Sequence, residues 1–375
     1  MRLRSLPALA GMAALVLFVT ACGSSSNGSS SNASSPGAAK TGGGAAKSSG
    51  GAINGAGSTL AAPVYQQWGS NLKSQGITVN YQPVGSGAGV QQLTAGTVDF
   101  AGSDPSLKDT EISAAQAKGV PVHIPTVFGA ITVAYNLSGV KAGLKLDGKT
   151  IADMFLGKVK TWSDPEIATL NPGVKLPSTA VSIVHRSDSS GTTAGFTTFL
   201  AAYSPTWKTS VGANKDVKWP SGTGAKGNAG VAGAVKQTDG AVGYVEQAYA
   251  LQNNFTTAQV KNKSGTFVAP TLASTSAAGV GLKVPADLRI KAINSPNPNA
   301  YPIVSQTFIL VYKDMCKAGV SQATAQNVVK FIKYGLGAGQ DVAKQLEFAP
   351  LPAPLLAKSQ AQLATLTCNG SPLTA

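Results

Sequence analysis

Short apolar runs alternate with segments of helical periodicity from residue 53 to the end of this 375-residue chain. Runs with the composition of strands are ITVNYQPV, VDFAGSD, AITVAYN, VSIVHRS, AVGYVE and QTFILVYK. Helical composition marks the segments between them, among them PVYQQWGSNLKSQ, PEIATL and TTAGFTTFLAAY. Strands that alternate with helices predict an α/β fold with largely parallel sheets. The stretch is longer than a single core usually serves, so we expect two lobes.

Three glycine- and serine-rich loops each stand between a predicted strand and a predicted helix. They are GAGSTLAAPVY (55–65), VGSGAGVQQL (84–93) and HRSDSSGTTAGF (185–196). In α/β folds, ligands gather at the carboxyl ends of strands, where helix N-termini present unpaired N–H groups and a partial positive charge. Three such loops in one chain favour convergence on one small anion.

Two acidic residues occur in these surroundings: Asp104 in VDFAGSD, and Asp188 two residues after Arg186. An ionised carboxylate only accepts hydrogen bonds. It would therefore oppose bare sulfate, but it would accept the proton that phosphate keeps near neutral pH. We expect Asp104 to select a protonated anion in this way. Asp188 is expected to steady the Arg186 guanidinium and to face the ligand. The alternative is that both acids cap helices or turns.

Basic residues outnumber acidic ones, with 30 Lys plus Arg against 16 Asp plus Glu and a formal net charge of +14. Nucleic-acid-binding proteins usually gather Lys and Arg into runs with interleaved aromatic residues, whereas the lysines here stand singly. We therefore expect no nucleic-acid partner. A diffuse positive field attracts small anions or an anionic cell envelope instead.

Residues 1–21 have the features of an export signal: a basic start, MRLR, and an apolar core, LPALAGMAALVLFV, that is short for a membrane span. Val19-Thr20-Ala21-Cys22 resembles a bacterial lipobox, in which Cys22 carries lipid (palmitate) and becomes the new N-terminus. An ordinary secretory signal that ends near a cysteine is the alternative. Residues 22–52 are almost all Ser, Gly, Ala and Asn, a composition typical of an unfolded tether. We expect a lipid-anchored protein on the extracytoplasmic face of the cell membrane.

The remaining cysteines, Cys316 and Cys368, form an even pair in an oxidising compartment. We predict a disulfide between them, which would contribute on the order of 4 kcal/mol in the chain-entropy description. Two free thiols are the alternative.

Many collinear motifs resemble those of the phosphate-binding lipoproteins of bacterial phosphate ABC transporters, and the likeness covers residues 53–375. These motifs include GAGSTLAAPVYQQW, NYQPVGSGAGVQQL, TVDFAGSDPSL, LDGKTIADMFLGKVKTWSDPEIATLNPG, RSDSSGTTAGFTTFL, VKWPSGTGAKGN and GAVGYVEQAYALQNN. The resemblance implies the two-lobed, type II periplasmic-binding-protein fold, with the ligand in the cleft between the lobes. Lobe 1 would comprise residues 53–127 plus 302–375 and lobe 2 residues 128–301, with hinge crossings near 127–129 and 301–303.

The same resemblance implies which residues bind phosphate. They are Thr59, Leu60, Ser86, Asp104, Arg186, Asp188, Ser190, Gly191 and Thr192. Leu60 would act through its backbone N–H, so its replacement of the family's frequent Phe has little consequence. Gly87-Ala88-Gly89 stands where some relatives have Ser-Gly-Gly, which leaves the backbone donors of that loop open.

The implied function is capture of inorganic phosphate and its delivery to an ABC permease, by a monomer with no cofactor, no metal and no catalytic residue. One alternative is a receptor for another tetrahedral oxyanion, such as sulfate or molybdate. The other is a phosphate-ester hydrolase. The two histidines, His123 and His185, are too few for a metal cluster. His185 adjoins Arg186 along a strand, so its side chain should point to the opposite face.

Two further motifs match nucleotide-binding patterns. Residues 143–150 satisfy the P-loop pattern, but no strand feeds directly into them, and we expect a turn that caps the TIADMFLG helix. Residues 222–227 satisfy the dinucleotide pattern GxGxxG, but Pro220 breaks any preceding strand, and we expect a loop near the mouth of the cleft.

Overall fold

A computed structural model of the chain describes residues 51–140 and 143–373. The predicted signal peptide and Cys22 lie outside the described residues. So does the predicted tether, except for its last two residues, Gly51 and Ala52. Ala52 is already the first residue of the first strand.

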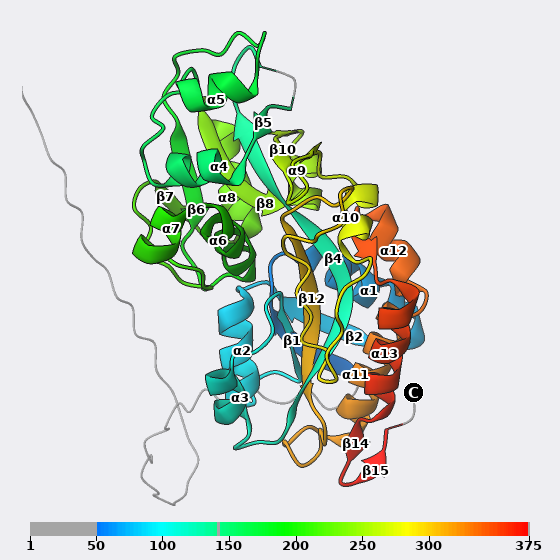
Figure 1. The fold of residues 1–375 in the computed structure, drawn as a ribbon. Coiled ribbons are helices and arrows are strands. Elements are labelled where there is room, and N and C mark those ends of the chain that lie inside the picture. The colour runs from blue at the N-terminus through cyan, green and yellow to red at the C-terminus, as the bar shows by residue number, and fades with distance from the viewer. Residues whose placement is uncertain (1–50, 141–142, 374–375) are drawn as a thin grey trace, which may run out of the picture. The chain divides into compact units, whose positions relative to one another are not determined.

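In the described part of the chain, ten strands form one mixed sheet with the main strand order β2-β1-β3-β12-β4-β8-β6-β7, and β13 and β9 pair with β4 (Figure 1). These strands are β1 (Ala52–Gly57), β2 (Thr78–Gln82), β3 (Phe100–Ser103), β4 (Pro121–Asn136), β6 (Ser182–Arg186), β7 (Thr223–Ala225), β8 (Ala241–Glu246), β9 (Thr256–Thr257), β12 (Val304–Tyr312) and β13 (Ala349–Pro350). Two small sheets contain β5 (Lys145–Leu146), β10 (Gln259–Lys261) and β11 (Phe267–Val268), and β14 (Thr367–Cys368) and β15 (Ser371–Pro372).

The sheet has two halves, which define the two lobes of the molecule. We call the half with β1, β2, β3, β12 and β13 lobe 1, and the half with β6, β7, β8 and β9 lobe 2. Strand β4 belongs to both, because its residues 121–130 pair with β12 and its residues 131–136 pair with β8. The residue limits predicted for the lobes and their hinge remain a prediction.

The predicted parallel arrangement holds for the outer strands of each half of the sheet but not for the central strands. β1 pairs in parallel with β2 and β3, and β6 pairs in parallel with β7 and β8. The central neighbours β3, β12, β4 and β8 are antiparallel, because β4 carries the chain out of lobe 1 and β12 carries it back.

Strand β4 starts nine residues earlier than the predicted run AITVAYN. Pro121 and Pro125 argue against a strand in this part of the sequence, because proline has no backbone N–H to donate to a neighbouring strand. The register between β4 and β12 shifts at Thr307 and Phe308, where Phe308 pairs with Pro125. A bulge of this kind accommodates a proline inside a strand.

Thirteen α-helices cover the sheet within the described residues. They are α1 (Ala62–Leu72), α2 (Ser86–Ala95), α3 (Asp109–Ala115), α4 (Gly148–Phe155), α5 (Pro165–Leu170), α6 (Gly191–Tyr203), α7 (Pro205–Ser210), α8 (Gly227–Gln237), α9 (Gln247–Gln252), α10 (Leu272–Ala278), α11 (Gln322–Gly335), α12 (Gly339–Gln345) and α13 (Ala353–Ala364). A short 3-10 helix (Lys73–Gln75) follows α1. Helices α1, α2 and α11 pack on lobe 1, while α6 and α8 pack on lobe 2. The segment that matches the P-loop pattern ends in α4, and Asp147 caps this helix by accepting from the Thr150 N–H at 2.8 Å.

Each lobe has a core rich in buried aromatic rings. In lobe 1, Tyr65 packs against Trp68 and Tyr81 at centroid distances of 5.4 and 5.3 Å. In lobe 2, Phe196 stacks on Tyr244 at 4.3 Å. The Tyr81 hydroxyl donates to the Ser58 carbonyl at 2.9 Å, and the Tyr244 hydroxyl accepts from the Arg186 N–H at 3.1 Å, so both rings contact the loops that carry the predicted binding residues. Burial of such large side chains therefore holds the backbone of those loops in place.

Cys316 and Cys368 form a disulfide, as predicted. It joins the segment after β12 to β14, in the part of lobe 1 near the C-terminus.

Candidate functional site

Strands from both lobes end at one place, and the predicted ligands follow them. The parallel strands β1 and β3 lead into Ser58 and Asp104, and α2 begins at Ser86. In lobe 2, β6 ends at Arg186, directly before the turn into α6. All the predicted ligands are buried except Asp188, which is partly exposed.

Asp104 lies at the centre of the lobe 1 side and is only 1% exposed. Its Oδ1 accepts from the Ser58 hydroxyl at 2.5 Å, and its Oδ2 accepts from the Ser86 hydroxyl at 3.3 Å. The Gln306 side chain donates to the backbone carbonyl of Asp104 at 2.8 Å. The sequence did not identify Ser58 or Gln306 as partners of Asp104; both hold Asp104 in position.

Burial raises the pKa of Asp104 to about 6, although hydrogen bonds from Ser58 and the charge of Arg186 oppose the rise. The carboxyl group is therefore mostly ionised at neutral pH and mostly protonated at pH 5. An ionised Asp104 can accept a proton-bearing ligand oxygen.

Arg186 is the cation of the site, and its side chain is 1% exposed. Its Nε and Nη2 donate to the two carboxylate oxygens of Asp188 at 2.7 and 2.5 Å, while Nη1 donates to Thr192 Oγ1 at 3.3 Å. The Gly227 N–H also donates to Asp188 Oδ1 at 3.0 Å. Burial alone would raise the pKa of Asp188, but Arg186 lowers it below its ordinary value. Asp188 thus fixes the plane of the guanidinium.

The first turn of α6 supplies neutral donors. Ser190 caps the helix by accepting from the Thr193 N–H at 3.0 Å, which leaves its own hydroxyl hydrogen available. The N–H groups of Gly191 and Thr192 are in the first turn, where no intrahelical acceptor exists. The positive end of the helix dipole adds to the attraction for an anion.

The two lobes contact each other through these residues. A side chain at Gly191 would place its Cβ 2.2 Å from Asp104 Oδ2, so glycine is required for this approach. The Gly87 N–H donates to the Ser189 carbonyl at 3.0 Å. Asn228 and Tyr249 of lobe 2 both donate to Thr59 of lobe 1, with distances of 2.8 Å to its hydroxyl and 2.9 Å to its carbonyl. The described conformation therefore has the lobes in contact around the site.

Residues 222–228 reach the site itself, not only the mouth of the cleft as expected. Thr223–Ala225 forms the edge strand β7, and the next residues bring Gly227 to Asp188 and Asn228 to Thr59. In the sequence, this role of the segment is indicated only by Asn228, an amide side chain at the start of a helix of mostly small apolar residues.

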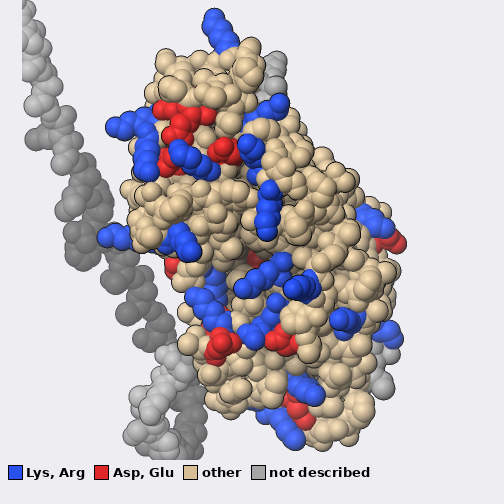
Figure 2. Space-filling model, viewed as in Figure 1, with Lys and Arg blue, Asp and Glu red and all other residues tan. Residues whose placement is uncertain are grey.

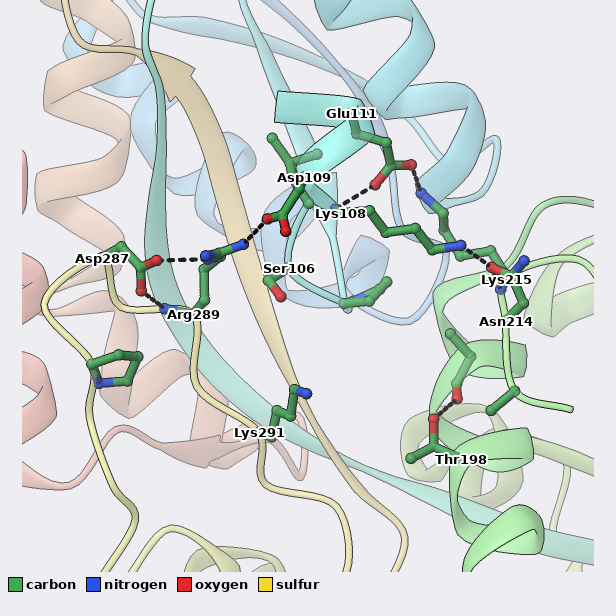
Figure 3. A pocket seen from close by; sticks show the side chains of 15 residues that line it. Ser106, Lys108, Asp109, Glu111, Thr198, Asn214, Lys215, Asp287, Arg289 and Lys291 are labelled. Carbon is green, nitrogen blue, oxygen red and sulfur yellow. Dashed lines mark hydrogen bonds and ion pairs between the residues drawn. The ribbon is translucent and has the colours of Figure 1, made fainter. Parts of the chain in front are cut away.

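The mouth of the cleft is a hollow of about 660 Å³ lined by both lobes (Figure 3). Across it, Lys108 donates to Asn214 Oδ1 at 2.8 Å, and Glu111 forms an ion pair with Lys215. A smaller hollow of about 140 Å³, which shares Lys291 with the larger one, reaches Gly191. Basic side chains gather around the junction of the lobes, with acidic side chains among them, and others are spread over both lobes (Figure 2).

The two histidines have structural partners. His123 accepts from the Leu107 N–H at 2.9 Å, and burial lowers its pKa to about 4. The ring of His185 stacks on Trp219 with the centroids 4.6 Å apart, and its Nδ1 lies 3.0 Å from the Arg186 carbonyl oxygen. No cluster of three or more metal-ligating side chains occurs among residues 51–140 and 143–373. Over those same residues, every helix is too short or too polar to span a bilayer.

Comparisons with known proteins give consistent results. The model of the PBP superfamily domain matches residues 31–335. The phosphate-binding protein PstS of Pasteurella multocida is 40% identical over 315 residues, which are 83% of this chain and 89% of the relative. The phosphate-binding protein PstS 2 of Mycobacterium tuberculosis is 33% identical over 370 residues, or 95% and 96% of the two chains.

Two solved structures share the fold. A high-affinity periplasmic phosphate-binding protein (PfluDING), bound with phosphate, has a TM-score of 0.66 and 24% identity, and covers 82% of this chain and 93% of its own. A phosphate-binding protein from Stenotrophomonas maltophilia has a TM-score of 0.63 and 21% identity, with coverages of 83% and 93%.

Proposed function

Because the chain belongs to the PBP superfamily and, within it, to the PstS phosphate-binding proteins, we propose that it captures inorganic phosphate outside the membrane and delivers it to the permease of an ABC transporter. It acts as a binding protein and not as an enzyme.

The composition of the buried site is the observation that carries this proposal. Neutral hydroxyl and N–H donors surround one guanidinium, whose charge Asp188 largely balances, and one carboxylate, Asp104, offers only acceptor oxygens. Phosphate carries a P–OH near neutral pH and can satisfy that acceptor, whereas sulfate cannot. The ligand set is Thr59, Leu60, Ser86, Asp104, Arg186, Asp188, Ser190, Gly191 and Thr192.

Closure of the lobes traps the ligand. The contacts of Gly191 with Asp104 and of Asn228 with Thr59 join opposite lobes, so they form only when the cleft closes. Donors from both lobes then surround one anion, and the hollow with Lys291 is the way in.

A melting-temperature panel on residues 51–375, followed by calorimetric titration, tests the proposal. Phosphate and arsenate should raise the midpoint by mass action, and sulfate and molybdate should not; a thousandfold excess over Kd adds about 4 kcal/mol. Stabilisation by sulfate or molybdate in place of phosphate would assign the chain to the other oxyanion receptors. Turnover of a chromogenic phosphate ester would make it a hydrolase.

The chain is a monomer anchored through lipid on Cys22, at the extracytoplasmic face of the cell membrane. The motif at Cys22 and the Ser/Gly-rich segment 22–52 support this part of the proposal. Labelling of cells with a palmitate analogue should mark the native chain and not Cys22→Ala, which should be lost from the membrane fraction. Equal labelling of both chains would exclude lipidation at Cys22. Light scattering measures the oligomeric state and should give the mass of a monomer.

A further inference from the structure

Asn228 connects the two lobes inside the site through its side-chain amide. It is the second residue of α8 and is fully buried. Its Nδ2 donates to Thr59 Oγ1 of lobe 1 at 2.8 Å and to Thr192 Oγ1 of lobe 2 at 3.2 Å. Both threonines belong to the residues proposed to bind phosphate, so Asn228 contacts two phosphate-binding side chains at once, one from each lobe.

The neighbouring backbone fixes the orientation of this amide. The Glu246 N–H, at the end of β8, donates to Asn228 Oδ1 at 2.9 Å. A backbone N–H can only donate, so the amide oxygen must face Glu246 and the NH₂ group must face the threonines. Each of the two NH₂ hydrogens then has one threonine oxygen as its acceptor.

The acceptor capacity of both threonine hydroxyls is filled in this arrangement. Thr59 Oγ1 also accepts from the Asn228 backbone N–H at 3.3 Å, and Thr192 Oγ1 also accepts from Arg186 Nη1 at 3.3 Å. A hydroxyl has two acceptor lone pairs and one hydrogen, so each threonine keeps only its hydrogen. Across residues 51–140 and 143–373, no protein acceptor takes either hydrogen at hydrogen-bond distance.

We propose that Asn228 is a positioning residue that makes the hydroxyls of Thr59 and Thr192 donors toward bound phosphate. Because one of these hydroxyls comes from each lobe, the full arrangement exists only in the closed cleft. Closure of the cleft therefore increases the number of hydrogen-bond donors that face the anion. With their acceptor capacity filled, the two hydroxyls also disfavour any ligand that needs a hydrogen-bond acceptor at these positions. This inference rests on the proposed function and assigns a role to the segment 222–228.

Calorimetric titration of phosphate into the native chain, Asn228→Ala and the matched control Asn262→Ala tests the inference. Asn262 is also buried and uses both ends of its amide, but its partners are in the turn after β10 and at Pro298 and Ala300. Asn228→Ala should weaken phosphate binding at least tenfold, and Asn262→Ala less than twofold. Equal affinities of Asn228→Ala and the native chain would overturn the assignment.

A double-mutant comparison separates positioning from a general structural effect. In the Thr59→Val, Thr192→Val background, Asn228→Ala should cost less than threefold, because no hydroxyl remains to be oriented. A cost of tenfold or more in that background means that Asn228 acts in another way, and the inference fails.

Asn228→Asp keeps the shape of the side chain and serves if Asn228→Ala does not fold. An ionised carboxylate would draw both hydroxyl hydrogens toward itself, so the affinity loss relative to the native chain should be larger at pH 8 than at pH 5.5. The same loss at both values contradicts the inference. If the native chain fails to bind phosphate, the proposed function fails. If the native chain binds phosphate and the Asn228 variants bind it equally tightly, the proposed function stands and only this inference fails.

Discussion

Sulfate should become a ligand of this protein when the pH falls, because Asp104 changes from an acceptor to a donor. Its carboxyl group is buried between the Ser58 and Ser86 hydroxyls, and burial raises its pKa to about 6. Above this value the carboxylate opposes the unprotonated oxygens of sulfate. Below it, the carboxylic acid can donate a hydrogen bond to one of them.

The size of the effect follows from the pKa. With a pKa of about 6, Asp104 in the described conformation is protonated in about 3% of molecules at pH 7.5 and in about 90% at pH 5. If only the protonated form accepts sulfate, the apparent affinity for sulfate should rise about thirtyfold between these two conditions. Sulfate itself carries no proton in this range, so the change belongs to the protein.

Calorimetric titration of sulfate at the two pH values measures the change, with three chains compared. The native chain should show the gain, and Asp104→Asn should bind sulfate more tightly than the native chain at pH 7.5, with little dependence on pH. Asp153→Asn is the control, since Lys149 and Lys158 hold the pKa of Asp153 below its ordinary value against the effect of burial, and it stays ionised. A native chain whose sulfate affinity is unchanged, or an Asp104→Asn chain with the native pH dependence, would refute the reasoning.

The same raised pKa gives a stability readout. A carboxyl group with a pKa higher in the folded than in the unfolded state stabilises the fold below its unfolded pKa of 3.8. That contribution is lost as the pH rises through about 6, and for Asp104 it amounts to on the order of 3 kcal/mol. Without ligand, the native chain should therefore lose stability between pH 4 and pH 7 more steeply than Asp104→Asn, as thermal unfolding measures.

Three further perturbations test other parts of the site and the fold. Arg186→Ala should lower phosphate affinity at least tenfold by calorimetry, because it removes the only guanidinium of the ligand set; an unchanged titration would exclude Arg186 from the site. Gly191→Ala should abolish tight binding, since its Cβ would meet Asp104 Oδ2 at 2.2 Å in the described conformation. Gly233→Ala, with open space around it, should bind like the native chain, and tight binding by both variants would contradict the closed contact. Replacement of Cys316 and Cys368 by Ser should lower the free energy of unfolding by about 4 kcal/mol and leave phosphate affinity unchanged; equal stability would mean that the closed loop constrains little.

Much of the local structure could be predicted, because it depends on neighbouring residues. The run AVGYVE coincides with β8 and PEIATL coincides with α5. The HRSDSSGTTAGF loop does precede a helix N-terminus, since Ser190 next to glycine and threonine is a favourable cap. The extension of β4 could not be predicted, because Pro125 is tolerated only at a bulge that the facing strand β12 creates, while Pro121 is tolerated as the first residue of the strand.

The sequence by itself determined the alternation of strands and helices, the cysteines that pair, and the chemical character of the three loops, all of which follow from residue type and short-range spacing. Only the tertiary structure decided which side chains complete the site. Asn228 contacts Thr59 across 169 residues of chain, and Gln306 supports Asp104 across 202. Contacts of this range depend on how two separately packed lobes approach each other. No local pattern encodes that approach, because the burial of each lobe's own core and the course of β4 and β12 between the lobes set it.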